Sequence, residues 1–578
     1  MLALLAAFLL AGAPAPDLLL ENATVYAAPD AKPAKFSIFV SGGKVLFVGD
    51  PAEARARGRA ANAVDLSGRF VFPGFADSHL HMSGVGKATE NANLREATSA
   101  ADAAARMKAA AAKLPDGAWV EGRGWDQTRW SGREFPDARM LDAAVADRPA
   151  IARRVDGHAI WVNSAALSAA KVTAATKDPD GGRILRRPDG SPSGVLVDNA
   201  MALVVSAAPP PTDADLERWL AEGAAACARA GLTEVQDASG YAPNEIAALE
   251  RLAARGALRI RVYATVSPSP DTLPGSLSRG RRVGGGDDFL TIRAIKSYAD
   301  GALGSRGAAL LADYSDEPGR RGLLVTPPER LAEVALAARR AGWQLWVHAI
   351  GDRGNRVALD AFEKAAAAVP QAPDGSDRPR IEHAQVIAPD DFPRFARLSV
   401  IASIQPVHAT SDMRWAEDRV GPERIAGAYA WRRLLDAGAK LAGGSDAPVE
   451  TESPLEGIYA AITRRDLAGN PPGGWRPQER LTRAEAIALY TSWAAWAAFE
   501  ETWRGRIAAG AAADLTVLSA DPMTAPESEI ARIPVSMTIV GGRIAYPAPA
   551  SRASEERRAA SLRIAGRRTS QAAGRPSP

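Results

Sequence analysis

Two histidines at the end of one apolar segment have the types and spacing needed to hold a metal ion. The segment runs from Val71 to His81 and ends with His79 and His81, separated by one residue. Alternate residues of a β-strand point to the same face, so a strand here would aim both imidazoles in one direction. The alternative is a buried strand with two incidental histidines. Because the chain has only 6 histidines, we favour a metal site.

Four further residues suited to a metal centre end other segments that have strand character: Lys296, His348, His383 and Asp446. Neutral imidazoles suit zinc and similar divalent ions, and a carboxylate adds an oxygen ligand. A metal ion makes its bound water a nucleophile, and Asp446 can accept the proton of that water and pass it to a leaving nitrogen. A lysine binds metal only after carbamylation. The alternative for Lys296 is a buried ion pair with Asp300 or Glu382.

A regular alternation of strands and helices must position these residues. The first predicted strand leads into His79, and seven more are predicted at 232–237, 259–266, 290–296, 344–348, 380–383, 399–405 and 440–446. Predicted helices lie between them at 213–230, 244–255, 328–341, 354–367 and 430–437. Eight such strands predict an α/β fold of the (β/α)8 TIM-barrel type, in which functional residues lie at the carboxyl ends of the strands.

Two other regions surround this alternation. Strand-like segments within 17–72 and 503–550 predict one small β-sandwich domain formed by both chain ends, with a hairpin at residues 41–44. The barrel then occupies 73–502. The stretch of about 88–215 interrupts the barrel rhythm after its first strand, and we expect it to be an α/β insertion.

Composition and the chain ends restrict the function further. The chain of 578 residues has a net charge of +3, from 70 basic and 67 acidic residues, which gives no case for a nucleic-acid partner. Residues 1–16 are apolar, too short for a membrane anchor, and typical of a signal peptide, so we expect export to the periplasm or medium; without cleavage the protein would be cytoplasmic. The tail at 551–578 is expected to be disordered, and Cys227 to be a core residue.

The motifs together resemble a known group of enzymes. Residues 72–81 (FPGFADSHLH), with His348, His383 and the Gly-Ser-Asp of 444–446, resemble the amidohydrolase superfamily of metal-dependent barrel hydrolases. Four further motifs resemble the YtcJ-like branch of amidohydrolase family 3; they lie at residues 122–126, 156–163, 300–306 and 403–406. The resemblance covers about residues 18–550. It implies that His79, His81 and Asp446 hold one metal ion. It also implies that His348 and His383 hold a second, with carbamylated Lys296 as a bridge; occupancy by one ion or two stays open.

The resemblance implies a hydrolase that cleaves a C–N bond, most simply the amide of an N-acyl or N-formyl small molecule. The alternatives are a deaminase, cyclic amidase or esterase using the same site, or an inactive barrel with a regulatory or binding role. Expected substrate-binding residues are His158, Asn163, Trp125, Asp126, Arg306 and Gln405. His408 is interpreted as either a pocket residue or a solvated loop histidine. A homo-oligomer is also considered.

Overall fold

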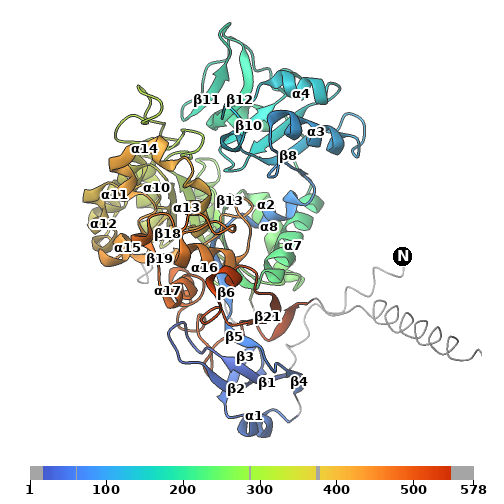
Figure 1. The fold of residues 1–578 in the computed structure, drawn as a ribbon, viewed down its shortest axis with the longest axis vertical. Coiled ribbons are helices and arrows are strands. Elements are labelled where there is room, and N and C mark those ends of the chain that lie inside the picture. Colours follow the sequence, from blue (N-terminus) through green and yellow to red (C-terminus); the bar gives the residue numbers. More distant parts are fainter. Residues whose placement is uncertain (1–16, 60, 285–287, 371, 373–377, 548–578) are drawn as a thin grey trace, which may run out of the picture.

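The computed structural model describes residues 17–59, 61–284, 288–370, 372 and 378–547. The predicted signal peptide (1–16) and the predicted tail (551–578) lie outside these residues. Three bodies are arranged along the long axis of the molecule: a β domain at one end, a barrel in the middle and an insertion at the other end (Figure 1). Among the described residues, no helix is long and apolar enough to cross a membrane.

The β domain is built from both ends of the chain, as predicted. Its strands are β1 (Leu18–Val25), β2 (Ala34–Ser41), β3 (Lys44–Gly49), β4 (Asn62–Asp65), β5 (Phe70–Pro73), β20 (Leu515–Leu518), β21 (Val535–Val540) and β22 (Arg543–Tyr546), with α1 (Pro51–Arg57) after β3. They form one hydrogen-bonded sheet in the order β22-β21-β20-β5-β1-β2-β3, and β4 also pairs with β1. The predicted hairpin joins β2 to β3 through Gly42 and Gly43, both at positive φ.

The barrel consists of eight parallel strands, which confirms the predicted number and order. They are β6 (Phe75–Leu80), β13 (Leu232–Tyr241), β14 (Arg261–Val266), β15 (Leu290–Tyr298), β16 (Gln344–Ala349), β17 (Arg380–His383), β18 (Ile401–Ile404) and β19 (Lys440–Gly443). Most of their residues are buried on both faces, as expected of a parallel sheet covered by helices.

Helices surround the barrel and end close to the predicted positions. They are α2 (Met82–Ala88), α7 (Asp213–Arg229), α8 (Pro243–Ala254), α9 (Leu273–Arg279), α10 (Pro328–Arg340), α11 (Asp352–Ala368), α12 (Phe392–Arg397), α13 (Pro406–Asp412), α14 (Ala416–Arg424), α15 (Trp431–Asp436), α16 (Pro454–Thr463), α17 (Arg483–Leu489), α18 (Ser492–Ala497) and α19 (Glu527–Ile530). The capping box of Thr212 and Asp215 starts α7, and Gly231 follows its end at a φ of +94°.

The barrel closes where its first strand meets its last. The backbone N–H of Asp446 donates to the carbonyl of His79 at 2.6 Å, and the N–H of His81 donates to Ala447 at 2.8 Å. The carboxylate of Asp77 accepts from the N–H of Ser445 at 3.0 Å. This β6–β19 seam therefore places three predicted metal ligands beside one another.

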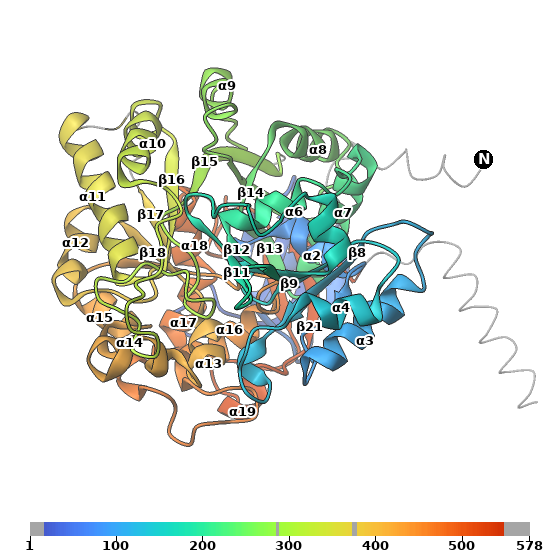
Figure 2. The ribbon, with the colours of Figure 1, turned by 90° about the horizontal axis from the view of Figure 1, so that it is seen from above.

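The insertion after β6 is an α/β unit, as predicted. A six-stranded sheet in the order β11-β12-β10-β9-β8-β7 carries helices α3 (Ala100–Ala111), α4 (Ala138–Ala144), α5 (Ser164–Ala169) and α6 (Ala202–Val205). Its strands are β7 (Ala92–Asn93), β8 (Val120–Trp125), β9 (Ala150–Arg154), β10 (Ala159–Val162), β11 (Gly182–Arg186) and β12 (Pro192–Asp198). Seen from above, this sheet lies over the barrel (Figure 2).

Candidate active site

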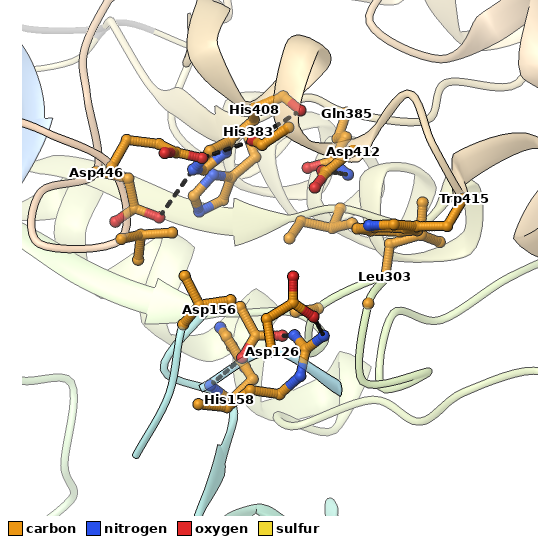
Figure 3. Close-up of a pocket in the computed structure, with 18 of the residues that line it drawn as sticks. Asp126, Asp156, His158, Leu303, His383, Gln385, His408, Asp412, Trp415 and Asp446 are labelled. Atoms are coloured by element: carbon orange, nitrogen blue, oxygen red, sulfur yellow. Dashed lines mark hydrogen bonds and ion pairs between the residues drawn. The ribbon is translucent and has the colours of Figure 1, made fainter. Parts of the chain in front are cut away.

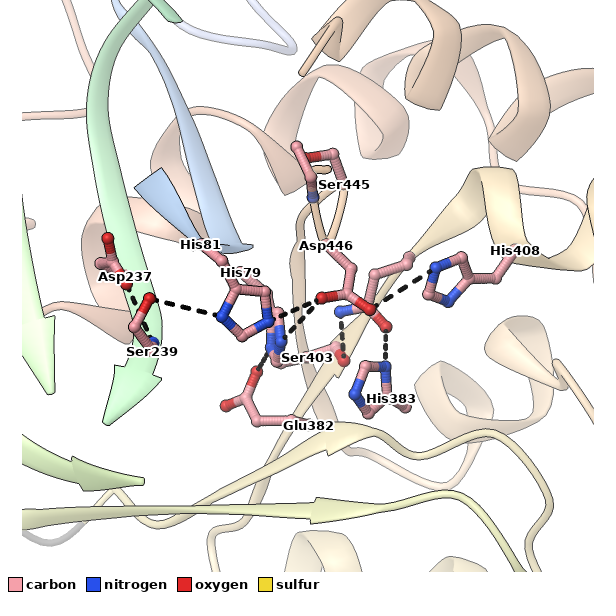
Figure 4. A network of polar contacts seen from close by, with 12 residues as sticks. His79, His81, Asp237, Ser239, Glu382, His383, Ser403, His408, Ser445 and Asp446 are labelled. Atoms are coloured by element: carbon pink, nitrogen blue, oxygen red, sulfur yellow. Dashed lines mark hydrogen bonds and ion pairs between the residues drawn. The ribbon is translucent and has the colours of Figure 1, made fainter. Parts of the chain in front are cut away.

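The seam brings His79, His81 and Asp446 together at the carboxyl end of the barrel (Figure 4). The Asp446 Oδ1 atom lies 3.0 Å from His81 Nε2 and 3.4 Å from His79 Nε2. All three potential ligand atoms lie within 4.8 Å of one another, which is close enough for them to share one metal ion. Burial alone would raise the pKa of Asp446, but its contacts with His79 and His81 outweigh that effect and keep the pKa well below the ordinary value. Asp446 is therefore a carboxylate at neutral pH.

A buried carboxylate orients His79. Glu382, on β17, contacts His79 Nδ1, while Arg380 donates from Nε to Glu382 Oε1 at 2.8 Å. Burial would raise the pKa of Glu382, but the charges of Arg380 and His79 hold it below its usual range. A charged Glu382 holds a proton on His79 Nδ1, so that Nε2, which faces Asp446, is the ring atom available to bind a metal ion. The same two carboxylates outweigh the effect of burial and raise the pKa of His79. This carboxylate–histidine arrangement is the one that commonly supports metal-binding histidines.

His383 and His408 form a second group with Asp446. Their ligand atoms and that of Asp446 lie within 4.8 Å of one another, and His408 Nε2 lies 3.7 Å from Asp446 Oδ2. Gln405 Oε1 lies 2.7 Å from His383 Nδ1, which directs His383 Nε2 away from Gln405. His408 is on α13, which begins directly after β18. The solvated-loop interpretation of His408 is wrong, because its side chain is only 12% exposed.

Lys296 and His348 line the same cavity but make fewer contacts. Among the described residues, Lys296 has no ion pair or hydrogen bond, and its Nζ lies 4.8 Å from the centre of the Tyr298 ring. The predicted alternative of an ion pair with Asp300 or Glu382 is therefore wrong: Asp300 accepts backbone N–H groups, and Glu382 pairs with Arg380. Burial lowers the pKa of Lys296 to about 8, which favours the neutral amine that carbamylation requires.

The donor set fits a divalent metal ion. The Nε2 atoms of His79 and His408 are buried, and neither has a hydrogen-bond partner. Such buried polar atoms are costly unless a ligand pairs with them. Burial lowers the pKa values of His81, His348 and His383, so these imidazoles are neutral near pH 7 and keep a lone pair for a metal.

The insertion completes the site from above. His158, from the turn between β9 and β10, lies 2.6 Å from Asp198 through its Nδ1 atom, and its ring centre lies 4.8 Å from that of His348. Added Cβ atoms on Gly301 and Gly307 would each lie 2.4 Å from Asp198 Oδ2, so these glycines allow the insertion to approach the barrel loop after β15.

Two adjoining pockets meet at this centre. They share the residues Asp156, His158, His348, His383, Asp446 and Val449. The first, which we name the charged pocket, includes Asp126, Leu303, Gln385, Asp412 and Trp415 (Figure 3). The second, which we name the histidine pocket, has a volume of about 360 Å³ and includes His79, His81, Lys296, Tyr298, Arg123 and Arg153.

The predicted substrate-binding residues separate into two groups. His158 lines both pockets, and Asp126 lines the charged pocket, where it pairs with Arg154 at 3.0 Å. The others line neither pocket. Gln405 instead orients His383, and Arg306 pairs with Asp316 at 3.0 Å.

Trp125 and Asn163 are components of the insertion core. The Trp125 indole donates to the Ala152 carbonyl at 2.7 Å, and Asn163 caps α5 through the N–H of Ala166 at 3.0 Å. Both side chains are fully buried. Their positions therefore support a structural role in place of the predicted substrate contact.

Sequence reasoning missed the contact of Glu382 with His79, the contact of Asp198 with His158 and the ligand-like position of His408. Backbone strain is a further signal that the sequence did not reveal: His383 and Asp446 have φ values of 75° and 58°. Residues other than glycine seldom adopt such values, and they concentrate at functional sites. The sequence motifs do not indicate that His383 and Asp446 adopt positive φ values.

A closed parallel barrel with clustered imidazoles and a carboxylate at the carboxyl ends of its strands defines the class of metal-dependent barrel hydrolases. The family profile described as "Amidohydrolase family" matches residues 62–546, and the chain belongs to this family.

Similar proteins extend over nearly the whole chain. The putative amidohydrolase YtcJ of Bacillus subtilis is 35% identical, covering 84% of this chain and 90% of its own. Protein LONG AFTER FAR-RED 3 of Arabidopsis thaliana is 32% identical, covering 92% of each chain. N-substituted formamide deformylase of Arthrobacter pascens is 27% identical, covering 92% of this chain and 98% of its own. The solved structure of an uncharacterized metal-dependent hydrolase from Pyrococcus horikoshii is 28% identical with a TM-score of 0.72, covering 89% of this chain and 99% of its own.

Proposed function

We propose that this protein hydrolyses a C–N bond, the amide of an N-acyl or N-formyl small molecule. The observation that carries the proposal is the convergence of five potential metal ligands where the two pockets meet: His79, His81, His383, His408 and Asp446. The name of the Arthrobacter relative gives N-substituted formamides as its substrates, which supports an amide as the bond cleaved. The alternative hypotheses are that the same site hydrolyses a cyclic amide, an imine or an ester.

The residues that would hold a divalent metal, which we propose to be zinc, are His79, His81, His383, His408 and Asp446. His348 and a carbamylated Lys296 would extend the site to a second ion. When bound, the metal supplies Lewis-acid polarisation of the carbonyl and an activated water.

Asp446 accepts the proton of the attacking water and delivers it to the leaving nitrogen. Its low pKa keeps it available as a base at neutral pH, and its Oδ2 atom is the one farther from His81 and nearer to His408. Glu382 holds His79 in one tautomer throughout.

The test is metal content per chain, measured together with turnover of a panel of N-acyl amines and N-acyl amino acids before and after chelation. We expect chelator-sensitive amide hydrolysis, reduced by roughly 10²- to 10⁴-fold in Asp446→Asn because the proton acceptor is lost. Asp436→Asn, at an exposed position in α15, is the matched control and should keep full activity.

Each outcome separates the candidate functions. Turnover of an ester or an imine without amide hydrolysis would overturn the C–N proposal while keeping the hydrolase. A protein that binds metal but turns over no member of the panel would favour the inactive, regulatory barrel. One bound ion with full activity would remove the bridging role of Lys296.

A further inference from the structure

Two arginines of the insertion face the metal centre side by side. Arg123 on β8 and Arg153 on β9 are direct partners in the register of two parallel strands, so their side chains leave the same face of the sheet. The neighbouring positions Gly122 and Ala152 turn toward the insertion core. Both arginines therefore point toward the barrel, and both line the histidine pocket together with His79 and His81.

Neither arginine has an acidic partner within the part of the chain that the structure describes. Arg123 Nε is buried and has no hydrogen-bond partner. Glu121, on the same face of β8, forms its ion pair with Lys87 instead. Burial, and after it the adjacent charge of Arg153, lower the pKa of Arg123 to about 10, although the charges of Asp446 and Asp156 act in the opposite direction.

Arg154 and Arg95 of the charged pocket, unlike Arg123 and Arg153, have acidic partners. There, Arg154 is held by Asp126 and Asp156, and Arg95 lies 3.6 Å from Glu450. Those guanidinium charges are already compensated within the protein. Arg123 and Arg153 are adjacent, partly buried guanidinium groups that repel each other. The charges of Asp446 and Asp156 near Arg123, and of Glu121 near Arg153, offset only part of the cost, because the pKa values of both arginines remain lowered. An anion placed between the two groups would remove the remaining cost.

We propose that Arg123 and Arg153 bind a carboxylate of the substrate, so that the preferred substrates are acidic N-acyl compounds such as N-acyl amino acids. Guanidinium groups are opposite in charge to carboxylates and complementary to their planar geometry. The volume of the histidine pocket, about 360 Å³, suits a small molecule. This inference rests on the proposed function, because the carboxylate lies on the same molecule whose amide is cleaved.

The first experiment measures binding without chemistry. Levulinate, a ketone analogue of N-acetylglycine that cannot be hydrolysed, is titrated calorimetrically into the metal-loaded enzyme. We expect Arg123→Gln and Arg153→Gln each to weaken levulinate binding by about 10- to 100-fold, because each removes a charge-assisted hydrogen bond. Arg123→Lys keeps the positive charge and should retain most of the affinity for levulinate. That result would show that the weaker binding of Arg123→Gln is caused by the lost charge and not by misfolding.

The second experiment measures selectivity. The kcat/KM for acetate release from N-acetylglycine should fall in both glutamine variants, mainly through KM, whereas that for the neutral N-acetylglycinamide should not change. Arg139→Gln, on α4 and outside both pockets, is the control variant.

Three results would overturn the inference. The first is levulinate binding that is unaffected in both glutamine variants. The second is binding that is weakened only by Arg129→Gln, a change of a residue that lines the charged pocket. The third is levulinate binding that is no tighter in the wild type than binding of 2-pentanone, a similar ketone without a carboxylate. Levulinate binding that depends on Arg123 and Arg153, without acetate release from any substrate, would keep the carboxylate site and reject the proposed function.

Discussion

At the residue scale, the site depends on side chains that orient the ligands as much as on the ligands themselves. Glu382 and Arg380 are both fully buried in β17, and together they fix the ring of His79. A buried ion pair adds little net stability, but it costs much to break. We therefore assign the pair to ligand positioning.

Replacing Glu382 with glutamine tests this assignment. Glu382→Gln keeps the shape but removes the charge that holds the Nδ1 proton of His79. We expect metal affinity to fall by about 10- to 100-fold, measured by competition with a chelator. Glu363→Gln, in an exposed ion-pair cluster on α11, is the control and should bind metal like the wild type.

A second residue prediction concerns His408. Loss of a ligand should cost more than loss of an orienting partner, so His408→Gln should lower the affinity for at least one metal ion by more than about tenfold. Metal titration followed by elemental analysis measures it. Ser411→Ala, one turn further along α13, serves as control, and equal metal binding by both variants would remove His408 from the site.

The sequence indicated candidate metal ligands, but it did not indicate the residues that orient them. His79 and His81 were recognised because a two-residue spacing at the end of a strand has a direct geometric meaning. Glu382 could not be recognised, because one buried carboxylate in a strand has no local pattern that reveals its partner 303 positions away. His408 depends on how α13 folds back over the barrel, which periodicity does not determine.

At the element scale, the β6–β19 seam is the most demanding contact in the site. A Cβ atom on Gly444 would lie 2.5 Å from the backbone nitrogen of His79 and 2.8 Å from Asp77 Oδ1. The two strands approach this closely only because residue 444 is a glycine.

Gly444→Ala should therefore separate the strands. We expect a loss of about 1–3 kcal/mol in the free energy of unfolding, together with weaker metal binding, because the ligands on the two strands move apart. Thermal unfolding and metal content measure the two effects. Gly275→Ala, in α9 with open space around its Cβ position, should leave metal binding unchanged.

The strand order was predictable because most barrel strands are short runs rich in apolar residues that alternate with helices along the chain. The insertion was predicted as an α/β unit, but its strand order was not. Its face toward the barrel, which carries Arg123 and Arg153, could not be predicted, because it depends on which side of the insertion sheet docks onto the barrel.

At the scale of the whole molecule, a buried ionic contact joins the β domain to the barrel. Asp514, just before β20, accepts from Arg261 of β14 at 2.8 Å and from the N–H of Gly541 at 2.8 Å. Burial would raise the pKa of Asp514, but the charges of Arg261 and Arg504 outweigh it and lower the pKa below 3.8.

Asp514→Asn should lower the free energy of unfolding by about 3 kcal/mol at pH 7, because it removes the buried carboxylate that pairs with the buried Arg261. The lowered pKa means that this contribution is fully present above pH 3.8 and is lost as the pH falls through the pKa of the folded state. Denaturant unfolding of the wild type and the variant should therefore differ at pH 7 and converge in acid. Asp30→Asn, exposed in the same domain, should differ from the wild type at neither pH.

The β6–β19 seam joins candidate metal ligands that are synthesised far apart in time. His79 and His81 leave the ribosome early, whereas Asp446 and the strand that carries it come only after the insertion and six further strands have been made. A nascent chain shorter than this holds only two of the three candidate ligands of the first group. The first candidate ligand group is therefore complete only after β19 has been made and the barrel can close.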